Sequence, residues 1–284
     1  MPELPEVETI VTDLKRTVPG LKIIDLWTDI FAFKKIKKDV IKEKILKVER
    51  RGKNILIGLT NSKTIIVHQK MTGHLMYGKW AQKGNDWKSV LAGPMRDDPE
   101  NRFIHLIFFL SNGRQLALCD MRKFAKVVVL PTEKISEEFK KLGPDPFDKD
   151  FTFKKFIEIL PKKGKIKTVL MNQEIISGIG NIYSDEILWL AGIHPLKPVQ
   201  KLKEREIKKI YQAIKPVLKK AINARGSSYI DYRDARGKKG RYQEMQKAYG
   251  LEGTNCKKRD GGIIKRIKIG GRSAHFCPLH QRMF

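Results

Sequence analysis

The chain opens with MPELPEVETIVTDLKRT (residues 1–17), in which apolar residues recur at the spacing of a helix. The positions concerned are Val7, Ile10, Val11 and Leu14. An amphipathic helix is therefore expected directly behind the terminus. From about residue 21 to 132 the pattern changes to short strands separated by turn residues. Strands are expected at 54–59, 64–68, 103–110 and 125–130. This order of elements predicts a β-sandwich or barrel accompanied by one helix.

The second half of the chain has a helical pattern, and it follows a Gly- and Pro-rich linker at 142–146. Helices are expected at 151–160, 164–175, 181–191 and 201–224. Residues 77–101 show no clear periodicity and are expected to form a long loop, and 226–249 a mobile one. We therefore predict an α+β chain of four parts. These are an N-terminal β-sandwich domain at 1–133, a linker at 134–150, a helical domain at 151–249, and a β-hairpin finger at 250–284.

The charge of the chain points to a polyanionic partner. Lys and Arg number 58 against 31 Asp and Glu, a formal net charge of +27, of which +16 lies between Lys201 and Phe284. Nucleic acid is the expected partner, since phosphate neutralisation dominates such binding; a generally lysine-rich proteome is the alternative. No apolar run is long enough to cross a membrane, and the start lacks a secretory signal. Three cysteines do not make a disulfide framework, so a cytoplasmic protein is expected.

The first residues carry candidate chemistry. Removal of Met1 would leave Pro2 with a free secondary amine, which titrates near pH 8 and is partly nucleophilic at neutral pH. Glu3 and Glu6 follow, and carboxylates near such an amine can act in general acid–base catalysis. The alternative is a disordered terminus that happens to be rich in Pro and Glu.

A second candidate element is the turn Ser177-Gly178-Ile179-Gly180-Asn181 between two expected helices. Its glycines allow the backbone to approach a ligand closely, and the free N–H groups at the start of the next helix attract anions. An ordinary helical hairpin is the alternative. Four nearby lysines favour a DNA phosphate: Lys162, Lys163, Lys165 and Lys167.

The C-terminal segment contains two pairs of potential metal ligands, Cys256 with Asp260 and Cys277 with His280. Their spacing around a basic hairpin resembles a zinc ribbon, with one Zn²⁺ per chain. The alternative is a hairpin that folds without metal and keeps both cysteines reduced. Basic residues lie between the pairs, at Lys265, Arg266, Lys268 and Arg272.

Three motifs occur in the order and at the spacing found in one family. They are Pro2-Glu3-Leu4-Pro5-Glu6, Gly178-Ile179-Gly180-Asn181-Ile182-Tyr183, and Gly270-Gly271-Arg272 with Phe276-Cys277-Pro278. The chain resembles the formamidopyrimidine-DNA glycosylase family over nearly its whole length. Its Pro-Glu-Leu-Pro-Glu start is unlike the Pro-Glu-Gly-Pro-Glu of the endonuclease VIII branch.

The resemblance implies a bifunctional glycosylase and AP lyase that removes oxidised purines such as 8-oxoguanine and formamidopyrimidines. Pro2 would attack C1′ of the damaged nucleotide, Glu3 would act as general acid on the sugar, and Glu6 would take part in catalysis. Lys53 would assist proton transfer and grip phosphates, and Arg272 would hold phosphates during β- and δ-elimination.

The target base must leave the stack, and the resemblance implies which residues replace it. Arg122 would face the orphan cytosine, Phe124 would insert as a wedge into the base stack, and Met71 would plug the vacated space. Asn181 would bind phosphate, as would Arg102 and Lys163. The loop at 226–249 would close over the extruded base with Ser228, Tyr229 and Tyr232. Damaged double-stranded DNA is the expected partner of a monomeric protein associated with the bacterial nucleoid.

The chain departs from the family pattern at three places. The usual four cysteines of the finger become Cys256, Asp260 (or Arg259), Cys277 and His280, the glycine after the wedge becomes Ala125, and an aspartate becomes Asn172. Three other functions are left open. They are an endonuclease VIII-like enzyme for oxidised pyrimidines, a non-catalytic protein that binds damaged DNA, and a zinc-ribbon module of translation or transcription.

Overall fold

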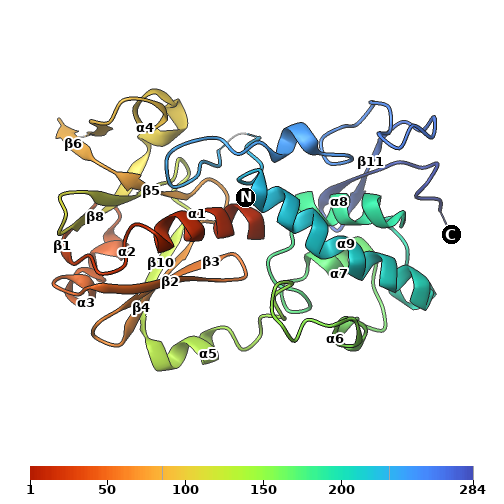
Figure 1. The fold of residues 1–284 in the computed structure, drawn as a ribbon, viewed down its shortest axis with the longest axis horizontal. Helices are drawn as coiled ribbons and strands as arrows, with labels where there is room; N and C mark the ends of the chain where they lie inside the picture. Colours follow the sequence, from red (N-terminus) through yellow and green to blue (C-terminus); the bar gives the residue numbers. More distant parts are fainter. Residues whose placement is uncertain (85, 230, 284) are drawn as a thin grey trace. The chain divides into compact units, whose positions relative to one another are not determined.

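The computed structural model describes residues 1–84, 86–229 and 231–283. It divides into two compact units, each shown in the ribbon of Figure 1. The first unit combines Met1–Lys140 with Ala224–Gln243, and the second combines Lys141–Asn223 with Glu244–Phe284. Residues 224–243, which the sequence assigns to the helical domain, thus pack within the first unit. The functional boundaries at 133, 150 and 249 stay predictions.

Two four-stranded antiparallel sheets form the first unit, which confirms the predicted β-sandwich. One sheet has the order β1 (Ile23–Thr28), β8 (Ile104–Leu110), β9 (Gln115–Cys119) and β5 (His74–Gly78). The other has the order β10 (Lys126–Pro131), β4 (Lys63–His68), β3 (Asn54–Leu59) and β2 (Ile45–Arg51). Alternate side chains of both sheets join one buried apolar cluster, as expected of facing sheets.

The predicted N-terminal helix is α1 (Leu4–Lys15), and it is buried on more than its apolar face. Its four predicted apolar positions lie in the core cluster of the sandwich. Glu6, Thr9 and Asp13, on other sides of the helix, are buried as well. The segment 224–243 accounts for part of this burial, because Arg225 pairs with Asp13 and Ser227 donates to Glu6.

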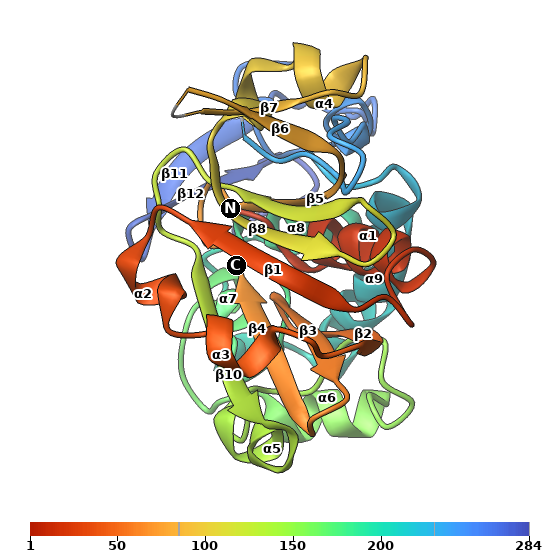
Figure 2. The same ribbon diagram turned by 90° about the vertical axis from the view of Figure 1, so that its left-hand side faces the viewer.

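The expected long loop at 77–101 is wrong, because the structure forms a β-hairpin there. Strand β6 (Trp80–Lys83) pairs with β7 (Asp86–Ser89), and the helices α4 (Pro94–Asp97) and η1 (Pro99–Arg102) follow. Trp87 packs edge-on against Trp27 of β1 and Phe109 of β8, with ring centroids 5.4 and 5.8 Å away. The hairpin therefore covers the face of the first sheet that points away from the sandwich core (Figure 2).

The segment 226–249 was expected to be a mobile loop, but its described part is largely buried and hydrogen-bonded. Arg233 pairs with Asp98 at 2.7 Å, and Asn101 donates to the carbonyl of Gly237 at 2.9 Å. The short helix η4 (Tyr242–Met245) ends this packed part. The segment is irregular in backbone but fixed by polar contacts to residues far away in the sequence.

The second unit has the predicted helices, each close to its expected position. They are α6 (Phe153–Ile159), α7 (Ile166–Met171), α8 (Asn181–Ala191) and α9 (Glu204–Asn223). The finger is the antiparallel pair β11 (Lys265–Ile269) and β12 (Arg272–Phe276). Its two-residue turn, Gly270-Gly271, has positive φ at both positions, the geometry of a type I′ hairpin that glycine allows without strain.

Short elements complete the chain. They are α2 (Phe31–Lys34), α3 (Lys37–Val40), η2 (Thr132–Lys134), α5 (Ile135–Glu138) and η3 (Val199–Lys201). Among the described helices, none has the length and apolar content that crossing a membrane needs.

Candidate catalytic and nucleic-acid-binding site

The N terminus of α1 is a buried cluster of acidic groups. Glu3 caps the helix, and its backbone N–H donates to Glu6 Oε2 at 2.8 Å in a capping box. The other carboxylate oxygen of Glu6, Oε1, accepts from the backbone N–H of Ser227 at 2.7 Å. Glu6 is 1% exposed, and Pro2 and Glu3 are buried beside it. The terminus is therefore held in place by backbone N–H groups on both sides of Glu6.

Lys53 lies on the tight turn between β2 and β3 and is only 6% exposed. Arg50 ties this turn to α1, since its Nε donates to Glu8 Oε2 at 2.6 Å and its Nη1 donates to the carbonyl of Gly52 at 3.2 Å. The arrangement ties the turn that carries Lys53 to α1. A lysine is almost never buried without a polar partner or a function.

His68 ends β4, where it pairs with Asn54 of the neighbouring strand. Burial, together with the positive charges of Lys70 and Lys53, lowers the pKa of its imidazole to about 4. The ring is therefore neutral at physiological pH. Its Nδ1 accepts the backbone N–H of Lys70 at 3.0 Å, which shapes the loop that leads to Met71.

Gln69 is a buried polar residue that sequence reasoning missed. It is 1% exposed, and neither atom of its side-chain amide has a hydrogen-bond partner among the described residues. Gln69 follows His68, whereas Lys53 precedes Asn54, so the antiparallel register places the two residues next to each other at the end of the sheet. An unsatisfied buried amide costs about 1–3 kcal/mol.

Gln69→Leu is expected to raise the free energy of unfolding by about 1–3 kcal/mol, because it removes this unsatisfied amide. Thermal and denaturant melts measure the change. Gln115→Leu is the matched control, since the Gln115 amide accepts from the Trp80 N–H at 2.5 Å and donates to its carbonyl at 3.1 Å. The control variant should lose stability, and a loss in both variants would contradict the prediction.

The segment 121–124, here called the void-filling loop, exposes the side chains predicted to enter DNA. Asp120 shapes it, because its Oδ1 accepts from the Arg122 N–H and its Oδ2 from the Ala125 N–H, at 3.3 and 2.6 Å. Asp120 also binds the hydroxyl of Thr72, which brings the loop of Met71 alongside.

Two exposed apolar side chains, Met121 and Phe124, flank two cationic ones on this loop. Phe124 is 49% exposed, and Met71 and Met121 are partly exposed as well. The Arg122 guanidinium carbon lies 4.4 Å from the centroid of the Phe124 ring. The structure thus gathers Met71, Arg122 and Phe124 on one surface, whereas Asp120 and Thr72, which position them, were not identified from the sequence.

The turn between α7 and α8 is held by side chains that sequence reasoning also missed. Gln173 donates to the carbonyls of Met171 and Ile179 and accepts from the Gly178 N–H at 2.9 Å. Gly178 has a φ of 90°, which glycine adopts freely. This bracing presents Asn181 at the first position of α8, and the N-terminal end of a helix favours an anion.

Lys167 does not join the surface lysines that were expected to face DNA phosphate. It is 0% exposed, and its Nζ binds Asp185 Oδ1 at 2.5 Å, Ser184 Oγ at 3.2 Å and the carbonyl of Asn181 at 3.2 Å. Asp185 Oδ2 in turn accepts from the backbone N–H of His275 in β12 at 2.9 Å. Lys167 therefore joins the turn to the finger, while Lys163 is exposed.

Cys256, Asp260, Cys277 and His280 come together at the base of the finger. One ligand atom from each lies within 4.8 Å of all the others. Asp260 Oδ2 is 2.8 Å from His280 Nδ1, and Cys256 Sγ is 3.6 Å from the same nitrogen. His280 Nε2 faces the carbonyl of Trp189 at 3.2 Å, so Nδ1 is the nitrogen available to a metal. The fourth member of the cluster is Asp260, the first alternative of the sequence, rather than Arg259.

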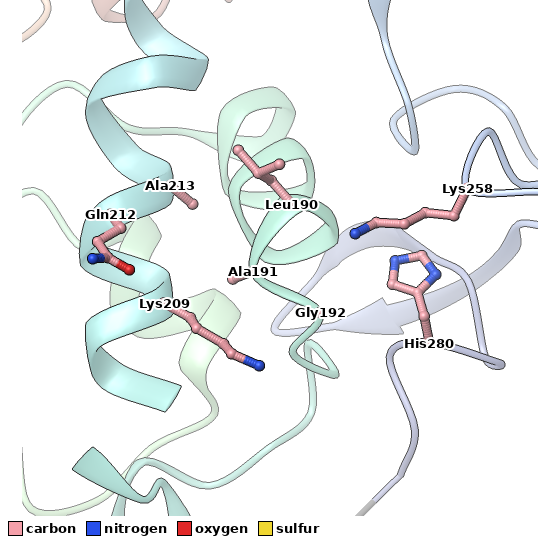
Figure 3. Close-up of a pocket in the computed structure, with 8 residues that line it drawn as sticks. All are labelled: Leu190, Ala191, Gly192, Lys209, Gln212, Ala213, Lys258 and His280. Atoms are coloured by element: carbon pink, nitrogen blue, oxygen red, sulfur yellow. The ribbon is translucent and has the colours of Figure 1, made fainter. Parts of the chain in front are cut away.

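A pocket of about 460 Å³ borders this cluster on the side of His280 (Figure 3). Its walls come from the end of α8, from α9 and from the segment before β11. The lining residues are Leu190, Ala191, Gly192, Lys209, Gln212, Ala213, Lys258 and His280. The side chains of Lys209 and Lys258 extend toward the hollow in Figure 3. His280 thus belongs both to the four-residue cluster and to the wall of the pocket.

Several predicted residues lie apart from these clusters or serve the fold. Arg102 is exposed, with its guanidinium 4.8 Å from the Phe103 ring centroid, and Arg272 is exposed beside the finger turn. Ser228 binds the carbonyl of Tyr232 at 2.6 Å, and the hydroxyl of Tyr232 donates to the carbonyl of Glu6 at 3.2 Å. Tyr229 is half exposed.

Comparison with known proteins gives a consistent result over the whole chain. Residues 1–127 match the formamidopyrimidine-DNA glycosylase N-terminal domain, and residues 142–232 match the formamidopyrimidine-DNA glycosylase H2TH domain. A formamidopyrimidine-DNA glycosylase of Pelotomaculum thermopropionicum is 39% identical over 295 residues, with all of both chains covered. One of Herpetosiphon aurantiacus is 38% identical over 289 residues, covering 99% of this chain and all of the relative.

A solved structure shares the fold. The Lactococcus lactis Fpg in complex with abasic-site DNA has a TM-score of 0.85 and 35% sequence identity. The match covers 99% of this chain and all of that one.

Proposed function

The chain belongs to the formamidopyrimidine-DNA glycosylase family, and from this membership we propose which of its residues carry out the reaction. The protein is a DNA glycosylase of base excision repair with an accompanying AP lyase activity, and damaged DNA is its partner. Its substrates are oxidised purines such as 8-oxoguanine and formamidopyrimidines. We propose that the protein acts in the cytoplasm, at the nucleoid, because its substrate is DNA.

In the proposed reaction, the amine of Pro2 attacks C1′ of the damaged nucleotide after Met1 has been removed. The glycosidic bond breaks as the new bond forms, and Glu3 protonates the opening sugar as general acid. The resulting iminium makes the neighbouring C–H bond acidic, so that β- and then δ-elimination release the phosphates. Lys53 assists proton transfer, and Arg272 holds phosphate during the later step.

One observation carries this proposal: Pro2, Glu3 and Glu6 are buried at the start of α1, and Lys53 is buried on the β2–β3 turn, which Arg50 ties to α1 through Glu8. Buried ionisable groups in a cluster are typical of catalytic sites. Glu6 has a positioning role in this proposal, because its carboxylate accepts hydrogen bonds from the backbone N–H groups of Glu3 and Ser227 and fixes both.

The remaining groups serve DNA binding in this proposal. Met71, Arg122 and Phe124 fill the space left by the extruded nucleotide, since exposed apolar groups can enter a base stack. Asn181 binds phosphate at the start of α8, and Arg102 and Lys163 contribute charge. These groups are exposed or partly exposed, as binding to a large partner requires.

The overall test is a trapping assay. Purified protein is incubated with a duplex containing one 8-oxoguanine opposite cytosine, and borohydride then reduces any imine to a stable cross-link. A cross-link that maps to Pro2 is expected, with weaker excision of thymine glycol in a matched duplex. Faster excision of thymine glycol would favour the endonuclease VIII-like function. Binding without excision of either base would favour a non-catalytic protein.

Glu3→Gln is expected to slow base release by about 10²–10⁴-fold, the range usual for loss of a general acid. Cleavage at a preformed abasic site should fall much less, because that substrate has already lost its base. Single-turnover assays on the two duplexes measure both steps. Glu133→Gln makes the same substitution at an exposed residue and should leave both rates unchanged. Equal losses on the two substrates would contradict the assignment of Glu3.

We also propose that Cys256, Asp260, Cys277 and His280 hold one zinc ion. Two thiolates, one imidazole and one carboxylate are all accepted zinc ligands, and their spacing suits a tetrahedral site. The hydrogen bond from His280 Nε2 to the Trp189 carbonyl would orient the ring, as outer partners of zinc-bound histidines usually do. The ion would stabilise the finger that carries Arg272.

Metal removal is expected to lower the melting temperature and weaken DNA binding. A chelator or Asp260→Ala should do so, whereas Asp150→Ala, at an exposed residue outside the cluster, serves as the control. Elemental analysis of the purified protein should give about one zinc per chain, the stoichiometry of a four-ligand structural site. Metal-free protein with unchanged melting and DNA affinity would contradict the zinc proposal.

A further inference from the structure

Helices α2 and α3 form an anchored ridge whose outward side chains have no part in the site described above. Phe33, Ile36 and Val40 are buried in the core of the sandwich and fix the backbone. Both helices come directly after β1 in the chain and pack against it, as Figure 2 shows. The residues between the anchors therefore point outward from a well-supported backbone.

The outward side chains are one aromatic ring and a group of lysines. Phe31 is 76% exposed, the highest value among the large apolar residues that the structure describes. Lys34, Lys35, Lys37 and Lys38, together with Ile41, line a shallow depression of about 530 Å³. Residues 31–42 contain five lysines and a single acidic residue, Asp39.

Most of this charge is uncompensated. Lys37 pairs with Asp25 at 2.8 Å, and Asp39 pairs with Lys63 at 2.6 Å. Lys34, Lys35 and Lys38 have no carboxylate within 4.0 Å among the described residues. Three ammonium groups around one depression, without acidic partners, repel each other, and an anion with several charges would relieve this repulsion.

A chain of contacts connects the ridge to the void-filling loop. Asp29, two residues before Phe31, accepts from Lys123 Nζ at 2.9 Å and lies 2.9 Å from His105 Nδ1. Lys123 stands between Arg122 and Phe124 and has a positive φ of 55°. The ridge and the loop thus form one continuous surface of the first unit.

We propose that Phe31, Lys34, Lys35 and Lys38 bind the duplex that flanks the lesion, an inference that rests on the proposed DNA-binding part of the void-filling loop. The three ammonium groups contact successive backbone phosphates, and the Phe31 ring packs on exposed sugar or base surface. Continuity with the loop favours DNA over an acidic protein or an anionic membrane. The surface adds affinity that is independent of the damaged base.

The test measures binding as a function of flank length. Fluorescence anisotropy gives the affinity for duplexes with one abasic-site analogue, with long flanks or with either flank shortened to roughly half a helical turn. The variants are Phe31→Ser and the triple variant Lys34→Gln, Lys35→Gln, Lys38→Gln. A second triple variant, Lys208→Gln, Lys219→Gln, Lys220→Gln on α9, removes the same charge from the other unit. Thermal melts confirm that each variant is folded.

On long duplexes the triple ridge variant should bind about tenfold more weakly than wild type. The slope of log affinity against log salt concentration should become shallower by the equivalent of about three phosphate contacts. Phe31→Ser should lose affinity severalfold on the same duplexes. Shortening one of the two flanks should abolish the difference in affinity between the ridge variants and wild type. The ratio of the affinity of the α9 variant to that of wild type should not change when that flank is shortened.

Two results would overturn the inference. In one, the ridge variant binds every duplex as wild type does, which leaves the surface to another anionic partner. In the other, it loses the same factor at every flank length, which shows general charge rather than local contact. Failure of wild-type protein to excise the lesion would count against the proposed function instead, because flank binding is measured without cleavage.

Discussion

Protein purified with Met1 still attached is expected to lose strand cleavage by ~10³-fold or more, together with all borohydride trapping. With Met1 in place, the nitrogen of Pro2 belongs to a peptide bond, and its lone pair is delocalised into the carbonyl. Such a nitrogen cannot attack C1′ or form an iminium. Pro2→Gly should also fail, since its flexible primary amine lacks the fixed position of the proline ring nitrogen.

Mass spectrometry separates the processed and unprocessed forms, and single-turnover cleavage compares them at equal active concentration. Both forms should bind a duplex with an abasic-site analogue, because Arg122, Phe124 and Asn181 are unchanged. Substantial trapping at an undiminished rate in the Met1-retaining form would refute the terminal-amine mechanism. A cross-link on an internal lysine would do the same.

Lys167→Met is expected to destabilise the second unit by about 3–5 kcal/mol, the usual cost of removing one partner of a buried ion pair. The change leaves the carboxylate of Asp185, which is 0% exposed, without its counter-charge. It also removes the donor to the carbonyl of Asn181, so the phosphate-binding turn should loosen. Denaturant unfolding measures the loss, and DNA affinity should fall with it.

Lys163→Met is the matched control, because Lys163 is exposed and lies only four residues away. It should change stability by less than about 0.5 kcal/mol, as exposed substitutions usually do. The double variant Lys167→Met, Asp185→Asn should recover part of the stability, since the buried charge is then gone. If Lys167→Met unfolded like Lys163→Met, the ion pair would not matter to the fold.

Much of the fold could be predicted because its local patterns agree with its tertiary structure. The period of α1 and the apolar runs of β3, β4, β8 and β10 indicated their elements directly. The hairpin β6–β7 could not be found this way, because its strands are four residues long and mostly polar. Trp80 and Trp87 fold it by packing on a sheet formed elsewhere in the chain, and such packing leaves no local period.

The candidate site was predicted from motifs, but the residues that support it were not. Ser227 lies 221 residues from Glu6, and Arg225 lies 212 residues from its partner Asp13, so no local spacing relates them. Lys167 looked like its neighbours Lys163 and Lys165, and only the packing of α7 on α8 distinguishes it. Gln173 and Asp120 act through backbone groups of turns, whose shape a sequence pattern does not reveal.

The discontinuous first unit has a consequence for how the protein is made. Its last part, Ala224–Gln243, supplies the N–H group that binds Glu6 and the guanidinium that binds Asp13. During synthesis, at roughly 5–20 residues per second, the beginning of the chain leaves the ribosome well before this part exists. Until then Glu6 and Asp13 lack these partners, and the removal of Met1 that the proposed mechanism requires can take place. The order of translation thus leaves time for this processing before the last part of the first unit packs on α1.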